Sequence, residues 1–169
     1  MYHAHVDEVR QQQAGLEGAL IVREPGLTRS PDEHVIFIKG SRLGGRRQRP
    51  EINGETNPDT VILHVGRQAR LRILSLNTYG PVPIVSLTAR PDSAPILTRD
   101  TLLVQWRLVA KDGTDLPATV QTLRSAEVVV TMGETYDFVY TPQRPGQLRL
   151  EMRANTIGVV LARVPIRVE

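Results

Sequence analysis

A succession of short apolar runs, separated by turn residues, limits the fold of this chain more than any other feature. Nine runs rich in Val, Ile, Leu and aromatic side chains lie between residue 34 and the C-terminus. They cover residues 34–38, 61–65, 69–77, 83–88, 102–110, 127–131, 135–141, 147–153 and 159–168. Glycine turns at 112–113, 132–133 and 145–146 separate several of them. Regular short strands with such turns predict an all-β sandwich or barrel.

Alternation within one run supports this prediction. Tyr136, Phe138 and Tyr140 fall on one face of a strand, whereas Asp137 falls on the other. We therefore expect one face of this strand to be core.

The first 31 residues have a different organisation. Asp7 can cap a short helix that ends at residue 13, Gly15 is a natural stop, and a strand is expected over 18–23. Residues 24–31, rich in Pro, Gly, Thr and Ser, are typical of a linker. Residues 2–5 resemble the middle of a strand that has no preceding partner. We expect residues 1–23 to be an incomplete extra unit, left by truncation, before a domain over 32–169.

Composition excludes several kinds of chemistry. The chain has no cysteine, so it forms no disulfide and no thiolate-ligated copper or zinc site. Its apolar runs are far shorter than the ~20 residues that a membrane helix needs. The net charge of +3 comes from arginines with acids interspersed, which predicts a mixed surface. A basic loop carries four arginines, but no aromatic residues interleave with them, so nucleic-acid binding is not expected. These are Arg42, Arg46, Arg47 and Arg49.

His3 and His5 are the sharpest local motif, because residues i and i+2 of a strand project to the same face. Two imidazoles so placed can serve one metal or a metal pair. Taken alone, the motif is more often two polar residues on a solvated strand face than a metal site.

The surrounding residues favour the metal site. Tyr2-His3-Ala4-His5 precedes a helix and then Gly15-Leu16-Glu17-Gly18-Ala19-Leu20-Ile21-Val22. This stretch resembles the second His-x-His segment of multicopper oxidases, which closes a first cupredoxin domain, except that Met1 stands where the family has an aromatic residue.

The resemblance implies that His3 and His5 each bind one of the two type 3 coppers of a trinuclear cluster that reduces dioxygen. Copper, dioxygen, a reducing substrate and the remaining cupredoxin domains or subunits would then be partners, in a periplasmic or extracellular protein. Asp7 and Glu8 are candidates to orient the ligands; the alternative is that they are ordinary acids at a helix start.

The rest of the chain resembles a later, plastocyanin-like cupredoxin domain, which implies a Greek-key β-sandwich. Its markers include 52–54, 109–117 and 132–138. The two copper-binding stretches of such domains, His-Pro-x-His-Leu-His and His-Cys-His-x-x-x-His, are absent. Residues 81–87 and 151–153 stand near their places, so we expect no type 1 copper and no turnover by this chain alone.

Four further residues that can bind metals are expected to be structural. His34 and His64 lie alone on predicted strands, away from the His-x-His motif. Met132 and Met152 are expected to fill the core, as methionines in such strands usually do.

The sequence is therefore compatible with two functions. The chain is either part of a multicopper oxidase that contributes type 3 ligands, or a non-enzymatic cupredoxin-like binding or assembly module.

Overall fold

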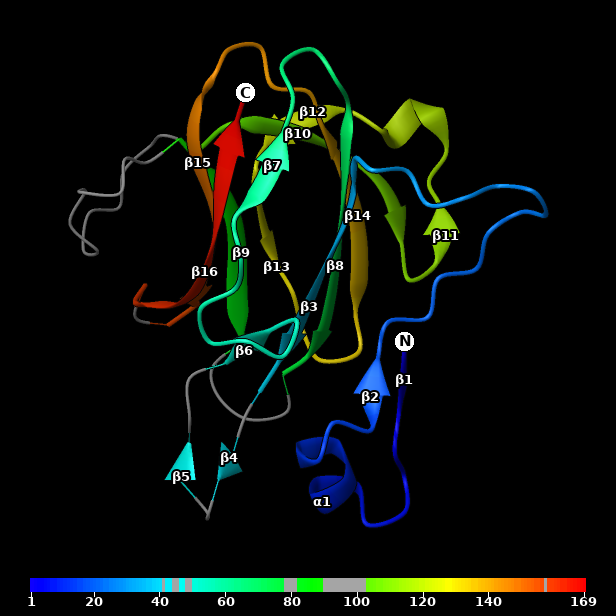
Figure 1. Ribbon diagram of the computed structural model, residues 1–169, viewed down its shortest axis with the longest axis vertical. Helices are drawn as coiled ribbons and strands as arrows, with labels where there is room; N and C mark the ends of the chain where they lie inside the picture. The colour runs from blue at the N-terminus through cyan, green and yellow to red at the C-terminus, as the bar shows by residue number, and fades with distance from the viewer. Residues whose placement is uncertain (41, 44–45, 48–49, 78–81, 90–102, 157) are drawn as a thin grey trace.

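Two β-sheets pack face to face in the computed structural model (Figure 1), which describes all residues except 41, 44–45, 48–49, 78–81, 90–102 and 157. The larger sheet contains β3 (Glu33–Lys39), β6 (Glu51–Ile52), β8 (Ala69–Leu76), β10 (Gln105–Lys111), β11 (Thr114–Asp115), β12 (Leu123–Ser125) and β14 (Thr135–Tyr140). The smaller sheet contains β7 (Val61–Leu63), β9 (Pro83–Thr88), β13 (Glu127–Val129), β15 (Gly146–Ala154) and β16 (Val160–Val168).

Strand order is β11-β10-β14-β8-β3-β6 in the larger sheet, with β12 also on β10, and β13-β9-β15-β16-β7 in the smaller sheet. The chain crosses repeatedly from one sheet to the other, as between β8, β9 and β10 (Figure 1). The pairs β3/β8 and β7/β16 are parallel, and the other described pairs are antiparallel. The predicted all-β sandwich is therefore confirmed.

The core lies between the sheets and follows from the period-two alternation of their strands. Trp106 of β10 and Phe138 of β14 are fully buried, and their rings stack with centroids 3.8 Å apart. Tyr136 and Tyr140 pack against this core from the same strand as Phe138, as the alternation predicts.

The outer face of the larger sheet has two halves. One half is a charged network in which Glu33 accepts hydrogen bonds from Arg23 and Arg72, and Asp137 accepts from Arg70 and Arg72. The other half is apolar and consists of Phe37, Leu74 and Leu76, against which Met1 and Ala19 pack. The side chains that β8 directs outward thus change from arginine to leucine where the N-terminus covers the sheet.

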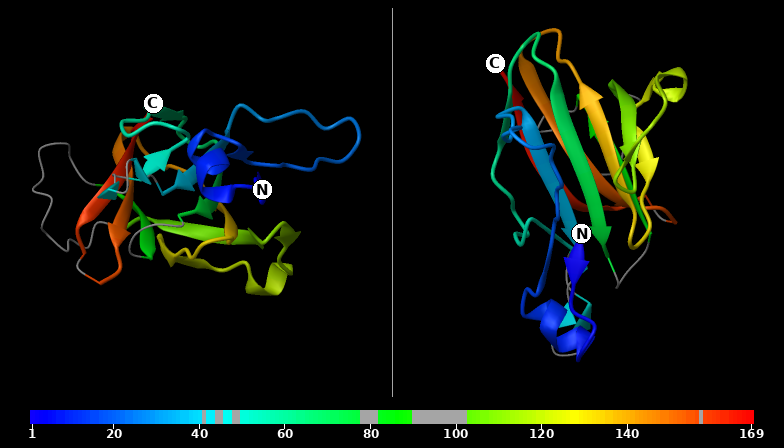
Figure 2. Two further views of the ribbon diagram at one scale, coloured as in Figure 1. Left: turned by 90° about the horizontal axis from the view of Figure 1, so that it is seen from below. Right: turned by 90° about the vertical axis from the view of Figure 1, so that its right-hand side faces the viewer.

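The helical part of the N-terminal segment (residues 1–23) lies beyond one end of the sandwich (Figure 2), whereas Met1, Ala19 and Arg23 contact the outer face of the larger sheet. The segment contains β1 (Tyr2–His3), α1 (Glu8–Gln13) and β2 (Glu17–Gly18), and β1 pairs with β2 in a two-stranded sheet of its own. In Figure 1 it lies beside the small hairpin of β4 (Arg42–Leu43) and β5 (Arg46–Arg47). The basic loop considered for nucleic acid thus includes a hairpin, and Arg49 lies outside the described residues.

Three local predictions are wrong. The strand expected over 18–23 is reduced to β2, because residues 19–23 pair with no strand in the described part of the chain. Asp7 precedes α1 but makes no capping hydrogen bond through its side chain; it adopts a left-handed conformation and pairs with Arg10. Met132 is 59% exposed because it lies in the turn before β14, whereas Met152 is buried in the core as expected.

The short strands β6, β11 and β12 were not predicted, because two or three residues carry too little alternation to be recognised. The start of the run expected over 102–110 lies outside the described residues. No helix in the described part of the chain is long and apolar enough to cross a membrane.

Candidate metal centre

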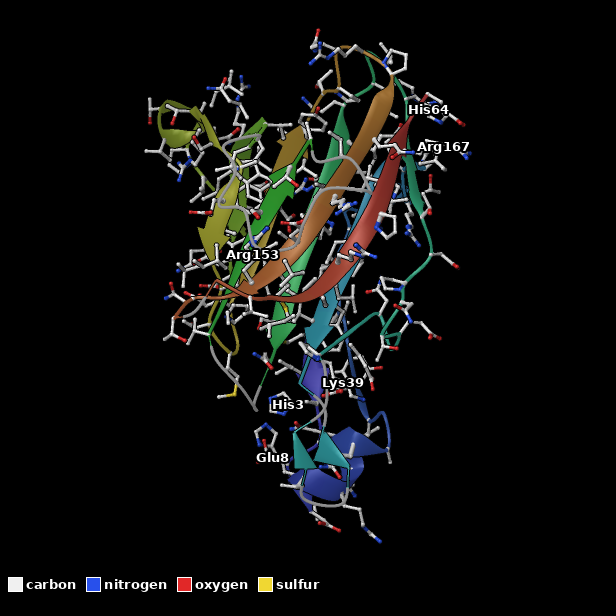
Figure 3. The ribbon with its side chains drawn as sticks, turned by 90° about the vertical axis from the view of Figure 1, so that its left-hand side faces the viewer. His3, Glu8, Lys39, His64, Arg153 and Arg167 are labelled. Carbon is white, nitrogen blue, oxygen red and sulfur yellow. The ribbon has the colours of Figure 1, made fainter. Side chains whose placement is uncertain are left out.

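The structure brings His3 and His5 together within the N-terminal segment. Their ring centroids are 4.4 Å apart and the ring planes are tilted by 40°. The ring of His3 is about three-quarters buried, and His5 is exposed. Figure 3 shows His3 close to Glu8 and on the side of the segment that lies toward Lys39.

A tight local fold fixes this arrangement. Ala4 N donates to Leu16 O at 3.1 Å, which extends the pairing of β1 with β2 around the intervening helix. Gly15 ends that helix with a φ of +92°, a conformation in which glycine is favoured. At Gly18 a Cβ would lie 2.8 Å from the hydroxyl oxygen of Tyr2, so a larger residue there would require the exposed Tyr2 side chain to move.

Gln12 and Glu8 of the helix contact the His3 ring. Gln12 is buried, and its Nε2 lies 2.9 Å from His3 Nδ1, 2.9 Å from Glu8 Oε1 and 3.3 Å from Ala4 O. Glu8 Oε1 is 3.9 Å from His3 Nδ1. Of the two acids considered as orienting groups, Glu8 therefore lies near a histidine, whereas Asp7 pairs with Arg10 at 2.6 Å.

Lys39, at the end of β3, fastens this unit to the sandwich. Its Nζ lies 3.0 Å from Glu17 Oε1 and 4.0 Å from Glu51 Oε2, and it donates to Gln12 O at 3.3 Å. The Lys39 and Glu17 side chains are both largely buried. Breaking such a pair leaves an uncompensated buried charge, so Lys39 should strongly influence where the segment sits.

The donors present suit part of a copper site. Neutral imidazole is a good copper ligand, and two imidazoles on one surface supply half or less of the usual coordination shell. Within the described residues, no group of three or more His, Cys, Asp or Glu side chains is arranged to hold a metal ion. Copper at His3 and His5 would thus need further ligands from another domain, another chain or solvent.

The other two histidines lie in the sandwich, away from this pair (Figure 3 labels His64). His34 is on β3; burial, the largest cause, and the neighbouring charge of Arg29 lower its pKa below 6.5. Its Nε2 is buried without a hydrogen-bond partner in the described part of the chain. His64 follows β7 and is half-buried.

The stretch 151–153, near the place of the missing copper ligands, holds an ion pair. Arg153 Nε donates to Glu151 Oε2 at 3.1 Å, and its Nη1 donates to Gly158 O at 3.0 Å. Met152 points into the core between them. Part of the other stretch, 81–87, forms β9, and Pro81 lies outside the described residues.

Two contributors to this site, Gln12 and Lys39, were missed from the sequence. Gln12 looks like one of three successive polar glutamines on a short helix, and only its burial distinguishes it. Lys39 is one of two lysines in an arginine-rich chain and ends an apolar run, which in retrospect marks a buried cation at a strand end.

No protein-family model matches this chain, and no curated protein matches it in sequence. Solved structures do match it. A multicopper oxidase from Pseudomonas thermotolerans superposes with a TM-score of 0.62 over 96% of this chain, at 20% identity. A copper nitrite reductase from Nitrosomonas europaea gives 0.63 over 98%, at 13% identity. Fet3p, a multicopper oxidase that functions in iron import, gives 0.62 over 94%, at 12% identity.

The fold is cupredoxin-like. This chain spans 39%, 59% and 31% of the three matched chains, respectively, so each of them is considerably longer. At these identities the likeness establishes the fold, while function has to be argued from the residues of the site.

Proposed function

We propose that this chain is part of a multicopper oxidase, in which residues 1–23 close one cupredoxin domain and residues 32–169 form the next, with 24–31 as a linker. His3 and His5 would each bind one type 3 copper of a trinuclear cluster. When bound, that cluster supplies the reduction of dioxygen, with electrons from a substrate that this chain does not identify.

The observation that carries this proposal is the pairing of two imidazoles, 4.4 Å apart, on a unit anchored to a cupredoxin-like sandwich. The superposition with the Pseudomonas oxidase omits 4% of 169 residues, which is about seven, so it includes most of the N-terminal segment as well. The matched fold thus extends beyond the sandwich into the N-terminal segment.

Exposed apolar side chains on the segment also support a missing domain. Val6, Leu20 and Val22 are 78%, 64% and 88% exposed. We propose that these strongly exposed apolar side chains lie on a surface that another unit covers. In the proposal, the remainder of the first cupredoxin domain covers them and contributes further copper ligands, because two imidazoles cannot hold three coppers.

The site's own residues have defined tasks in this proposal. His3 and His5 supply nitrogen donors, Glu8 lies beside the His3 ring, and Lys39 holds the helix end against β3. A periplasmic or extracellular location is part of the same proposal, by likeness to the family.

Copper titration tests the proposal. The chain should carry a short N-terminal extension, so that a free amino group near His3 does not itself chelate copper. After loading and dialysis, we expect the unaltered chain to retain copper and the His3→Ala/His5→Ala variant to lose it. A His64→Ala variant, which removes a histidine of the sandwich, should behave like the unaltered chain. Equal retention by the double variant would contradict the site and favour a non-enzymatic cupredoxin-like module.

A further inference from the structure

Gln12 has more hydrogen-bond acceptors around its amide nitrogen than it has protons to donate. Nε2 carries two protons and faces three acceptors, at His3 Nδ1, Glu8 Oε1 and Ala4 O. Gln12 is 7% exposed, so solvent does little to relieve this competition. The hydrogen bonding of His3 therefore depends on how Gln12 distributes its two protons among these three acceptors.

Two of the three neighbours fix the orientation of the amide. A backbone carbonyl and an ionised carboxylate only accept hydrogen bonds. If the amide were turned over, its oxygen would face the oxygens of Ala4 and Glu8, which sets acceptor against acceptor at both contacts. The NH₂ group therefore points toward all three neighbours.

The orientation of the amide sets the tautomer of His3. The two shortest contacts of the NH₂ group, 2.9 Å each, are to His3 Nδ1 and Glu8 Oε1, whereas Ala4 O lies at 3.3 Å. Because an NH₂ group only donates, His3 Nδ1 accepts one of its two protons, and the proton of the neutral ring resides on Nε2. In this arrangement Nδ1 is occupied by Gln12 and Nε2 is protonated. Neither nitrogen is free to bind a metal.

Metal binding at Nε2 requires the ring proton to move to Nδ1, which then needs an acceptor. Glu8 Oε1, 3.9 Å away, lies within about 1 Å of hydrogen-bond distance, and its side chain is 50% exposed, so it has room to move. Carboxylates commonly fill this role behind metal-binding histidines. Binding through Nδ1 would instead require Gln12 to leave, and Gln12 is held at its backbone by Lys39.

We propose that Gln12 keeps metal-free His3 in the tautomer with its proton on Nε2, and that metal binding transfers the hydrogen bond of Nδ1 from Gln12 to Glu8. Glu8 is then a positioning residue for the metal-bound state, and Gln12 opposes that state. The exchange of partners on metal binding rests on the proposed copper site. The metal-free tautomer does not, because it is a property of the chain alone.

The test uses the chain with its N-terminal extension, labelled with ¹⁵N in histidine, and copper(I), which is diamagnetic and leaves the NMR signals of its ligands visible. Three variants are compared with the unaltered chain: Glu8→Gln removes the carboxylate, and Gln12→Met removes the amide at similar length. Asp7→Asn is the matched control, since it removes the neighbouring charge, which pairs with Arg10.

We expect metal-free His3 to carry its proton on Nε2 in the unaltered chain and to lose this preference in Gln12→Met. With copper(I), His3 should carry its proton on Nδ1. The affinity for copper(I) should fall about 10-fold or more in Glu8→Gln, which is the usual effect of removing a hydrogen-bond partner of a metal-binding histidine. Gln12→Met should bind at least as tightly as the unaltered chain, and Asp7→Asn should bind equally.

A proton on Nδ1 in the metal-free chain would overturn the first half of the inference. Unchanged affinity in Glu8→Gln, or a loss in Gln12→Met as large as that expected for Glu8→Gln, would overturn the second. If copper(I) binds without His3 and His5, the proposed function fails, while the metal-free tautomer still decides the role of Gln12.

Discussion

The sandwich and the N-terminal segment bury their apolar side chains to very different extents. Leu71, Leu87 and Trp106 of the sandwich are fully buried, whereas Leu20 and Val22 of the segment are 64% and 88% exposed. The sandwich has strands of up to nine residues, and the segment has strands of two. Sheets as small as that of the segment are not stable without support from elsewhere.

Ion pairs and a small apolar contact supply that support. Lys39 pairs with Glu17, Arg23 pairs with Glu33, and Met1 packs on the apolar half of the larger sheet. Stability thus resides in the sandwich, while the residues suited to metal chemistry lie in the segment. Substitutions should separate the two properties.

The largest expected effect is loss of stability from the sandwich core. Leu87→Ala should lower the free energy of unfolding by about 2–5 kcal/mol, because it removes a fully buried side chain and leaves a cavity. Urea unfolding followed by the fluorescence of Trp106, the sole tryptophan, measures this. Leu20→Ala in the segment should change the value by less than about 0.5 kcal/mol. Equal effects would show that the segment is part of the cooperative core.

The charged network between the two regions should give the next largest effect. Hydrogen bonds from Arg23, and then from Arg72, lower the pKa of Glu33 from 4.5 to about 2 against the opposing effect of burial. A difference of that size corresponds to about 3 kcal/mol at neutral pH. Glu33→Gln should lower the free energy of unfolding by much of this amount. Glu24→Gln, at an exposed position nearby, should leave it nearly unchanged.

The same network predicts a pH dependence. Because the pKa of Glu33 is lower in the folded chain than in the unfolded chain, its contribution is complete above pH 4.5 and is lost as the pH falls toward 2. Unfolding free energies measured at several pH values should fall less steeply across this window in Glu33→Gln. Parallel curves for the two proteins would contradict the assigned network.

The smallest expected effect is local. Lys39→Met removes the cation that holds Glu17, but the segment can swing outward and let that carboxylate reach water, so global stability should change little. Amides of residues 4–17 should instead exchange with solvent at least about 10-fold faster, as measured by hydrogen exchange. Lys111→Met, which removes the other lysine and its contact with Glu134, is the control. Unchanged exchange in Lys39→Met would mean that the apolar contact alone holds the segment.

Strand positions were predictable where a run was long and alternated. The run at 83–88 coincides with β9, and those at 135–141 and 147–153 agree with β14 and β15 to within a residue at each end. The strand predicted over residues 18–23 was wrong, because a segment with β propensity forms a strand only where a neighbouring strand can pair with it. The outward leucines of β8 are informative in hindsight, since a strand that is apolar on both faces at one end is covered there.

Only part of the candidate site could be predicted from the sequence. The spacing of His3 and His5 predicted two neighbouring imidazoles, and the rings do lie together, although β1 ends at His3 and His5 lies just beyond the strand. Gln12 and Lys39 depend instead on how a helix end meets the end of β3, which is a tertiary contact with no local pattern. Whether the histidines bind copper remains a prediction.

Copper(II) titration followed by NMR of the four histidine rings tests this account most directly, because paramagnetic copper broadens the signals of nearby nuclei. The chain with its N-terminal extension should be titrated at substoichiometric copper. The account predicts that the signals of His3 and His5 broaden first and together, while those of His34 and His64 persist. Broadening of His34 or His64 before or equally with the pair would contradict it.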